Sequence, residues 1–431
     1  MKSYFLKTMD IEPQAEQPWM SRLPFFYGWV VVTALAITQP VSWGILYYGF
    51  SAMLTPMQAE THWSRAALTG AFSLALLVSG ITAVPVGRWL DQHGARGVMT
   101  LGSCLAVLLV IAWAHVQTLV GFYAIWLGIG VIMAFVLYEP AFAVIATWFV
   151  RRRSQALTVL TFGGGLASVI FVPLTTYLTQ AHGWRNALLI LAAGLAAITI
   201  PLHALILRRD PAIVGAVPDG DLAAGMRSAR TQHRMETHST VHEALRGANF
   251  WCLSTAFSLS VFAAVAIAVH LIPFLMERGY PTSFAALTVS VLGGSQIPGR
   301  LVFAPLGSRL SLRWITAALF GMMAMGVLIL LAAPSGWLIL VGAALFGAGS
   351  GASSPARAAL VAEFYGVTHY GSINGMMSLA MTVAKASAPV GMGFLDTWAG
   401  QYAPVFWTLA TAALGAAGSI LLARQPRQRQ P

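Results

Sequence analysis

The chain has 431 residues, of which 57% are hydrophobic and only 9% are charged, and its mean hydropathy is +0.72. This composition is that of an integral membrane protein and excludes an ordinary soluble enzyme. The net charge of +11 does not indicate a nucleic-acid partner, because the basic residues gather in the polar segments on one side of the apolar runs.

The first 26 residues are expected to form a polar tail. Residues 1–24 contain no apolar stretch of the signal-peptide type, so the first apolar run is expected to remain as an uncleaved insertion signal. Two cysteines, Cys104 and Cys252, fall within apolar runs and give no information about disulfides.

Twelve apolar runs follow, each long enough for the ~30 Å hydrocarbon core, which takes about 20 residues of helix. An all-α integral membrane protein with twelve transmembrane helices is therefore predicted. The predicted spans are 27–54, 66–90, 97–115, 119–148, 154–180, 186–207, 249–276, 283–307, 313–333, 337–362, 371–397 and 402–423.

The distribution of Lys and Arg predicts the orientation. Nineteen of the 25 lie in segments on the side of both termini, and three, Arg65, Arg185 and Arg278, lie on the other side. Positive residues favour the cytoplasmic side, so both termini are expected there, in a multi-pass protein of a bacterial-type inner membrane. The remaining three, Arg300, Arg357 and Lys385, lie within predicted spans.

The chain repeats itself at a nearly constant offset. Three pairs of prolines in corresponding spans are 220, 215 and 216 residues apart: Pro85 and Pro305, Pro140 and Pro355, and Pro173 and Pro389. This repeat predicts two duplicated six-helix bundles, an arrangement that places substrate between them. We assign 27–207 and 249–423 to the bundles, 208–248 to a cytoplasmic linker and 424–431 to a cytoplasmic tail.

The linker is the only long polar segment between the predicted spans. Its mixed charge is typical of a tether between moving bundles, although a regulatory binding site remains an alternative. Near its end, Thr240 and Glu243 have the spacing of a capping box and predict a short helix before the seventh span.

A loop motif follows the second span, with Gly87, Asp91, Gly94 and Arg96 in the pattern G-x-x-x-D-x-x-G-x-R. It resembles the loop signature of the major facilitator superfamily, and the twelve-span layout covers the whole chain. The resemblance implies a gating role: the glycines permit close packing, and the carboxylate pairs with a cation or a helix N-terminus across the bundle interface. The second half has Ser311 in place of the aspartate.

Further features are similar to the monocarboxylate-porter branch and its oxalate–formate antiporter relatives. They are Tyr27-Gly-Trp29 at the start of the first span, Arg152-Arg-Ser-Gln-Ala156 before the triplet Gly163–Gly165, and Gln296-Ile-Pro-Gly-Arg300 in the eighth span. Monocarboxylate carriers have an acidic residue where this chain has Gln296. The antiporter relatives pair an arginine of the eighth helix with a lysine of the eleventh, which Arg300 and Lys385 match.

Arg300 and Lys385 are the principal candidates for substrate binding. A cation at the centre of a bilayer costs roughly 2.5–3.5 kcal/mol on insertion scales, so it normally faces a cavity or a partner. The eighth span has no acidic residue, and the nearest one to Lys385 in its own run is Asp396. We therefore expect an anionic ligand, held by the planar fork of the arginine and by a lysine that can release its proton when the anion leaves.

Further candidates surround this pair. Gln296, Tyr47, Tyr48 and Tyr138 are expected to orient a small anion without adding charge, and His270 to bond the substrate or sense protons. Glu139, His270 and Lys385 are candidates for proton coupling. A purely structural role is the alternative for each. For Arg357 we expect a structural role, with pairing to inner loops during gating as the alternative. We expect the many glycines, Gly293 and Gly294 included, to pack helices closely.

The sequence thus predicts a secondary transporter that moves a small monocarboxylate, such as lactate or pyruvate, by alternating access with protons. Alternatives are a carboxylate:carboxylate antiporter, a sensor that keeps the fold without transport, and an exporter of larger hydrophobic compounds. The expected partners are a small organic anion, protons and the lipid bilayer, without nucleic acid. No P-loop, metal cluster or nucleophile-and-base pattern is present, so neither an enzyme, a cofactor nor a metal is expected.

Overall fold

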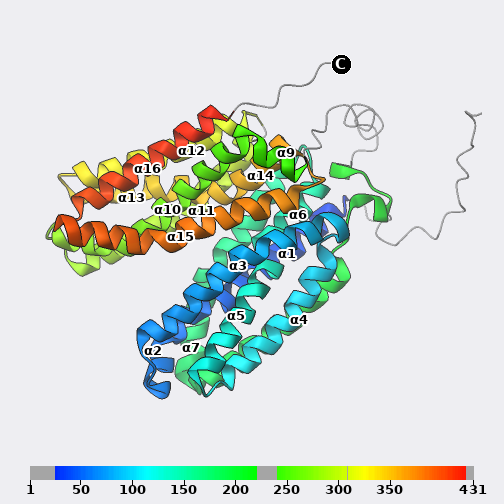
Figure 1. Cartoon of the computed structure of the whole chain (residues 1–431), viewed down its shortest axis with the longest axis horizontal. Coiled ribbons are helices and arrows are strands. Elements are labelled where there is room, and N and C mark those ends of the chain that lie inside the picture. Colours follow the sequence, from blue (N-terminus) through cyan, green and yellow to red (C-terminus); the bar gives the residue numbers. More distant parts are fainter. Residues whose placement is uncertain (1–24, 221–239, 308, 424–431) are drawn as a thin grey trace, which may run out of the picture.

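The computed structural model describes residues 25–220, 240–307 and 309–423. These residues form helices connected by short loops, and no strand occurs among them. Figure 1 shows two elongated bundles, one from each half of the chain, which lie close together at the end that carries α9 and spread apart toward the opposite end.

The N-terminal bundle contains α1 (Gly28–Trp43), the π-helix η2 (Gly44–Tyr48), α2 (Gly49–Thr61), α3 (Arg65–His93), α4 (Ala95–Ala114), α5 (Leu119–Val136), α6 (Tyr138–Trp148), α7 (Arg153–Pro201) and the π-helix η3 (Leu202–Ile206). The linker forms the 3-10 helices η4 (Pro211–Val214) and η5 (Pro218–Gly220). The C-terminal half contains α9 (Val241–Arg246), α10 (Ala248–Glu277), α11 (Thr282–Gly307), α12 (Leu312–Ala332), α13 (Gly336–Gly351), α14 (Ser353–Tyr365), α15 (Tyr370–Ala399) and α16 (Ala403–Leu422).

Within the described residues, nine helical stretches are long and apolar enough to cross a membrane. One of them, Arg153–Ile206, bends at Gly183, whose φ of 76° is left-handed, and so makes two crossings. Two further helices, α11 and α15, are 26 and 30 residues long. Together these elements make the twelve crossings that the sequence predicts.

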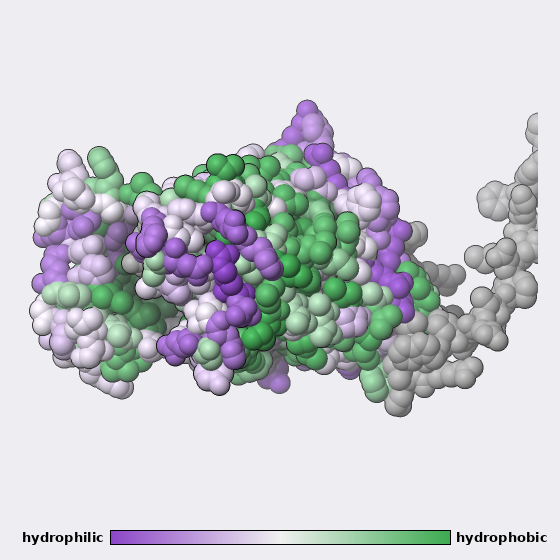
Figure 2. Space-filling model, turned by 90° about the horizontal axis from the view of Figure 1, so that it is seen from below, coloured by the Kyte–Doolittle hydropathy of each residue, from purple (hydrophilic) through white to green (hydrophobic). Residues whose placement is uncertain are grey.

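The surface is that of a protein in lipid. Large apolar side chains are exposed along the helices, among them Leu101 and Leu108 on α4 and Val390 and Phe394 on α15. On the face shown in Figure 2, a broad hydrophobic area lies to the right of the centre and is bordered by more hydrophilic residues on either side. Exposed apolar surface of this extent is unfavourable in water and favourable against hydrocarbon chains.

Two spans are broken at equivalent positions. The regular helix is interrupted at Leu137, between α5 and α6, and again at Ala352, between α13 and α14, which is 215 residues further on. Pro140 and Pro355 each lie three residues after the break. A missing N–H costs little there, because the first N–H groups of a helix have no acceptor within it. The buried Gln39 amide donates to the carbonyls of Val136 and Leu137 at 2.9 and 3.4 Å and so satisfies the first break.

The bundles join mainly in the half nearest the linker. The principal packing pairs across the interface are α3 with α15 and α7 with α11. The largest hydrophobic cluster continues from the linker-side half of the N-terminal bundle into the C-terminal bundle, whereas a second cluster lies wholly within the opposite half of the N-terminal bundle. The two packing pairs are related by the internal repeat, because α3 corresponds to α11 and α7 to α15.

Glycines bring the backbones of α3 and α15 into contact. A Cβ atom on Gly87 would lie 2.1 Å from the Gly371 carbonyl oxygen, and one on Gly375 would lie 2.4 Å from that of Ala83. No side chain fits at these distances. The predicted close-packing role does not hold for Gly293 and Gly294, which are exposed and where an added Cβ atom would have no heavy atom within 4 Å.

The start of the linker is docked on the N-terminal bundle. The Asp219 carboxylate accepts hydrogen bonds from the backbone N–H groups of Val150, Arg151 and Arg152 at 3.1, 2.7 and 3.2 Å. Asp219 adopts a left-handed φ of 62°. Its hydrogen bonds to the backbone of residues 150–152 offset the cost of this conformation. The predicted capping box is confirmed, because Thr240 and Glu243 cap α9 reciprocally.

The glycine contact predicts an asymmetric response to alanine. Gly87→Ala is expected to lower the melting temperature in detergent, because overpacking at a backbone contact costs about 1–3 kcal/mol. Gly97→Ala is the matched control, since nothing lies within 4 Å of its Cβ position. We expect that control to be neutral or slightly stabilising. Equal melting temperatures for the two variants would contradict a tightly packed interface.

Candidate functional site

Arg300 connects the two bundles. Its Nε donates to the carbonyl oxygen of Gly351 at 3.0 Å, within the C-terminal bundle, and its Nη1 donates to that of Thr161 on α7 at 2.8 Å. Its Nη2 has only a long contact of 3.5 Å with Oε1 of Gln296. The half-buried guanidinium is therefore held by two carbonyl dipoles, and no described residue forms a salt bridge with it.

The glycine triplet of α7 makes room for this site. A Cβ atom on Gly165 would lie 1.9 Å from Nη1 of Arg300, and one on Gly164 would lie 2.2 Å from the Tyr138 hydroxyl. Gly163 instead faces the backbone of α1, where a Cβ atom would lie 2.3 Å from the Ala36 carbonyl oxygen. Three consecutive glycines thus make room for one helix contact and for two candidate side chains, Arg300 and Tyr138.

A local π-helix places the tyrosines. Residues Gly44–Tyr48 form η2, in which Tyr47 and Tyr48 lie with ring centroids 5.0 Å apart. Trp43 connects them to Tyr138, at 5.3 Å from Tyr47 and 5.1 Å from Tyr138. Tyr48 and Tyr138 are both close enough to Arg300 to interact electrostatically with it. Short π-helices often mark functional positions, because they rotate side chains out of the regular register.

Lys385 is the second candidate cation, on α15. It is exposed although it lies midway along α15, and its charge interacts with those of Glu139 and Arg357 in the interior. No described residue forms a salt bridge with it. Nε2 of the buried His270 donates to the Pro389 carbonyl oxygen at 3.3 Å, one turn beyond Lys385 on the same helix. The contacts of His270 lie within the C-terminal bundle.

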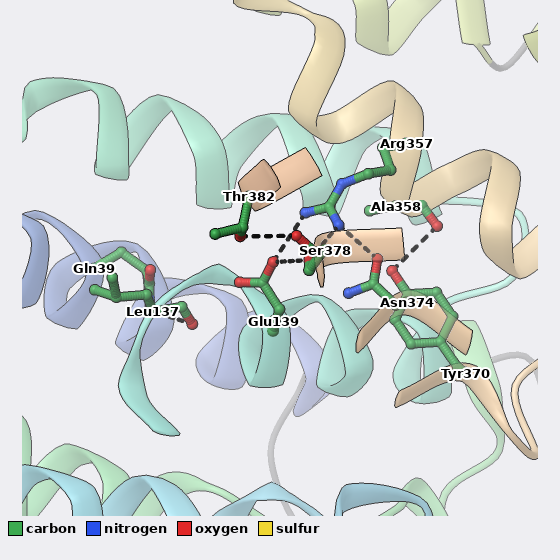
Figure 3. A network of polar contacts seen from close by, with 9 residues as sticks. All are labelled: Gln39, Leu137, Glu139, Arg357, Ala358, Tyr370, Asn374, Ser378 and Thr382. Carbon is green, nitrogen blue, oxygen red and sulfur yellow. Dashed lines mark hydrogen bonds and ion pairs between the residues drawn. The ribbon is translucent and has the colours of Figure 1, made fainter. Parts of the chain in front are cut away.

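A polar network around Arg357 also joins the bundles (Figure 3). Arg357 on α14 is paired with Glu139 on α6, with 3.2 Å between Nη2 and Oε1. Its Nη1 donates to Oδ1 of Asn374 and to Oγ of Ser378, both at 2.9 Å. The Ser378 hydroxyl also donates to Glu139. Glu139 stands in the first turn of α6, where the helix dipole favours an anion.

The loop motif forms a third connection on the linker side. The Asp91 carboxylate accepts hydrogen bonds from the N–H groups of Gly371 and Ser372 at 2.7 and 2.9 Å, and from the Ser372 hydroxyl at 2.5 Å. The two N–H groups belong to the first turn of α15, where amides have no acceptor within the helix. The carboxylate therefore binds a helix N-terminus. Gly94 has a left-handed φ of 76°, and Nε of Arg96 donates to the Ala204 carbonyl at 2.8 Å within its own bundle.

The structure thus brings Arg300, Gln296, Tyr48 and Tyr138 together, with Tyr47 beside them. The sequence reasoning missed the Thr161 and Gly351 carbonyls and the pairing of Arg357 with Glu139. One signal was available on α15, where polar residues recur on one face with helical spacing: Asn374, Ser378, Thr382 and Lys385.

The sequence resembles known transporters over almost its whole length. It is 28% identical to monocarboxylate transporter 11 of Homo sapiens over 420 residues, which cover 93% of this chain and 83% of that protein. It is 26% identical to monocarboxylate transporter 13 of Bos taurus over 421 residues, which cover 92% of this chain and 87% of that protein.

Solved structures show the same fold. The chain matches FucP, a major facilitator superfamily transporter in the outward conformation, with a TM-score of 0.72 at 16% identity over 93% of this chain and all of that one. It matches the human organic anion transporter MFSD10 with a TM-score of 0.63 at 16% identity, over 94% of this chain and 100% of that one. The sequence model of the Major Facilitator Superfamily matches residues 34–335 and 283–431. The chain therefore belongs to the major facilitator superfamily and is a transporter homologous to the monocarboxylate transporters.

Proposed function

We propose that this transporter moves a small monocarboxylate, with lactate or pyruvate as the type of substrate, by alternating access and together with protons. The observation that carries the proposal is the pair of cations between the bundles. Arg300 is held only by carbonyl groups, and Lys385 is exposed without a salt-bridge partner among the described residues. The monocarboxylate transporters named among its relatives support the same substrate class.

Arg300 offers a way for the substrate to change the bundle interface. Its hydrogen bond to Thr161 crosses from one bundle to the other, and a carbonyl is a weaker acceptor than a carboxylate. A substrate carboxylate that binds the guanidinium through two parallel hydrogen bonds takes the place of that carbonyl. Substrate binding then removes a contact that holds the bundles together, which links occupancy to the conformational change.

The half-buried tyrosines supply orientation. Tyr48 and Tyr138 lie near Arg300, and their hydroxyl groups donate hydrogen bonds without adding charge. Their rings and those of Tyr47 and Trp43 form an apolar wall for the carbon part of the acid. An apolar wall with a few convergent polar groups is typical of sites for small molecules.

The inner-membrane location and the orientation belong to the same proposal. The charge bias of the sequence supports a cytoplasmic linker. The bundles pack mainly on the linker side, so in this orientation the structure corresponds to an outward-facing state. We also assign a gating role to Gly87, Asp91, Gly94 and Arg96, because Asp91 is bonded across the linker-side interface.

Exchange of one carboxylate for another is the second candidate function. It is favoured by Gln296, a neutral residue that contacts Arg300 at 3.5 Å where monocarboxylate carriers have an acid. Proteoliposomes with clamped membrane potential separate the two functions. A symporter accumulates labelled L-lactate when only a pH gradient is imposed, whereas an exchanger moves label only when unlabelled carboxylate is present on the other side.

Substitutions of Arg300 and Lys385 test the anion site. Each charge-assisted hydrogen bond is worth about 1.5–3 kcal/mol, so Arg300→Gln and Lys385→Gln should each weaken L-lactate binding by roughly ten- to a hundredfold. Arg300→Lys keeps the charge but loses the planar fork and should also bind weakly. The effects should be non-additive, since both groups share one ligand. Calorimetry on purified, monodisperse protein measures binding, with the exposed Arg88→Gln as control. Normal binding by folded Arg300→Gln would refute the site.

Gly165 tests the geometry of the arginine without removing it. In Gly165→Ala the new methyl group must displace Nη1 of Arg300, which breaks its bond to Thr161. Because the displaced atom is the end of a flexible side chain, we expect folding to persist. The displaced guanidinium no longer presents both of its N–H groups to the carboxylate, so lactate binding should fall by roughly tenfold, the value of one charge-assisted hydrogen bond. Gly293→Ala, with open space at its Cβ position, is the control and should bind as the wild type does. Equal affinities in both variants would show that the position of Arg300 does not matter.

The proposed orientation can be checked by labelling. In a background without Cys104 and Cys252, a cysteine at the exposed Arg88 on the linker side should react with an impermeant maleimide only after the cells are opened. A cysteine at the exposed Thr282, at the opposite end, should react in intact cells. The reverse pattern would overturn the assignment of sides.

A further inference from the structure

The ion pair between Glu139 and Arg357 differs from the one between Glu60 and Arg185. Glu60 and Arg185, 2.7 Å apart, both belong to the N-terminal bundle. Glu139 and Arg357 come from different bundles, on α6 and α14. They lie just after the two equivalent helix breaks, in the positions that face each other across the interface (Figure 3). This pair must therefore separate whenever the linker side opens.

The two partners differ in their access to water. The Arg357 side chain is 5% exposed and that of Glu139 is 23% exposed. Arg357 keeps two neutral partners in its own bundle, Asn374 and Ser378, when Glu139 is removed. The arginine thus remains hydrogen-bonded after the bundles part, which limits the cost of leaving a buried charge without its counter-ion. Glu139 is the member of the pair that water can reach with a proton.

The charged and titratable groups around Glu139 determine the effect of neutralising its carboxylate. Arg357 approaches from α14, Lys385 and Tyr370 act on it from α15, and Tyr138 precedes it on α6. Two of these neighbours are cations and none is an acid. Neutralising Glu139 therefore removes the anion that attracts both Arg357 and Lys385. The site near Lys385 becomes more positive, which favours a substrate carboxylate.

We propose that Glu139 is the residue that binds the transported proton, and that its protonation opens the ion pair with Arg357 and so releases one of the contacts that close the linker side. This inference rests on the proposed function. It places the coupling carboxyl on α6, in the opposite bundle from Gln296, where monocarboxylate carriers have theirs. The proton moves from water on the open side to the Glu139 carboxylate and is released to water on the linker side, so one proton accompanies one monocarboxylate anion without net charge.

The first experiment measures the conformation without any substrate. Spin labels are attached at the exposed positions Arg88 and Leu310, on the linker side of the two bundles, after replacement of Cys104 and Cys252 by serine. Double electron–electron resonance then measures the distance between the two labels at mildly alkaline and at mildly acidic pH. In the wild type we expect the longer separation to gain population as pH falls, because a neutral Glu139 no longer attracts Arg357.

Glu139→Gln imitates the protonated acid and should show the longer separation at both pH values. Glu60→Gln is the matched control, since it neutralises an acid whose ion pair lies within one bundle, and should respond to pH as the wild type does. Glu139→Asp keeps a titratable carboxyl and should retain a pH response, which also covers the case in which Glu139→Gln fails to fold. A wild-type pH response in Glu139→Gln, or none in Glu139→Asp, would overturn the proposal.

The second experiment measures coupling in proteoliposomes with the membrane potential clamped at zero and empty liposomes as the blank. The wild type should accumulate labelled L-lactate above its external concentration when a pH gradient is imposed. Glu139→Gln should bring lactate only to equal concentrations on both sides, since a carrier without a proton site cannot use the gradient. Gradient-driven accumulation by Glu139→Gln would refute Glu139 as the proton site.

The two proposals fail in different ways. If the wild type transports no monocarboxylate, the proposed function is wrong, while loss of the pH-dependent separation in Glu139→Gln would still support the proton site. If lactate accumulates normally in both the wild type and Glu139→Gln, the transport function stands and the assignment of Glu139 does not.

Discussion

Buried charges in a low-dielectric interior must have partners, and in this protein some of these partners lie in the opposite bundle. Arg300 depends on the Thr161 carbonyl, Arg357 on Glu139, and Asp91 on the first turn of α15. Each half of the chain therefore has charged groups whose hydrogen bonds are completed by the other half. The same groups would be costly in a rigid membrane protein. Here they make the closed arrangement specific, because a shift of one helical turn leaves several of them unpaired.

The small residues serve these polar contacts. Glycines at Gly87, Gly371 and Gly375 let backbones touch, and the touching backbones bring Asp91 to the amides of α15. Gly165 does the same for the guanidinium of Arg300. Packing and electrostatics are thus parts of one design, since a methyl group at any of these positions would separate charges from their partners. In lipid, where apolar side chains gain little from meeting each other, such contacts have more weight.

Hydropathy and repeated prolines were sufficient to predict the fold, because a membrane span needs length and apolar character more than any specific partner. From the sequence, Arg300 and Lys385 were also expected to face a cavity or a partner within the membrane. The sequence could not predict η2, whose first residue, Gly44, packs closely against Phe171 on α7. Nor could it pair Arg357 with Glu139, which are 218 residues apart. The polar face of α15 indicated that this helix contacts other polar groups. Which groups these are is decided by tertiary packing.

The repeated break at Leu137 and Ala352 has a mechanical consequence. It separates α6 and α14, which carry Glu139 and Arg357, from the outer segments α5 and α13 of the same spans. Backbone torsions at a break absorb rotation that a continuous helix would transmit along its full length. The short inner helices therefore have pivots of their own, placed symmetrically in the two halves. Such a pair of pivots lets the inner end of the pathway widen while the outer parts of both spans keep their packing. The two ends of the molecule can therefore move independently.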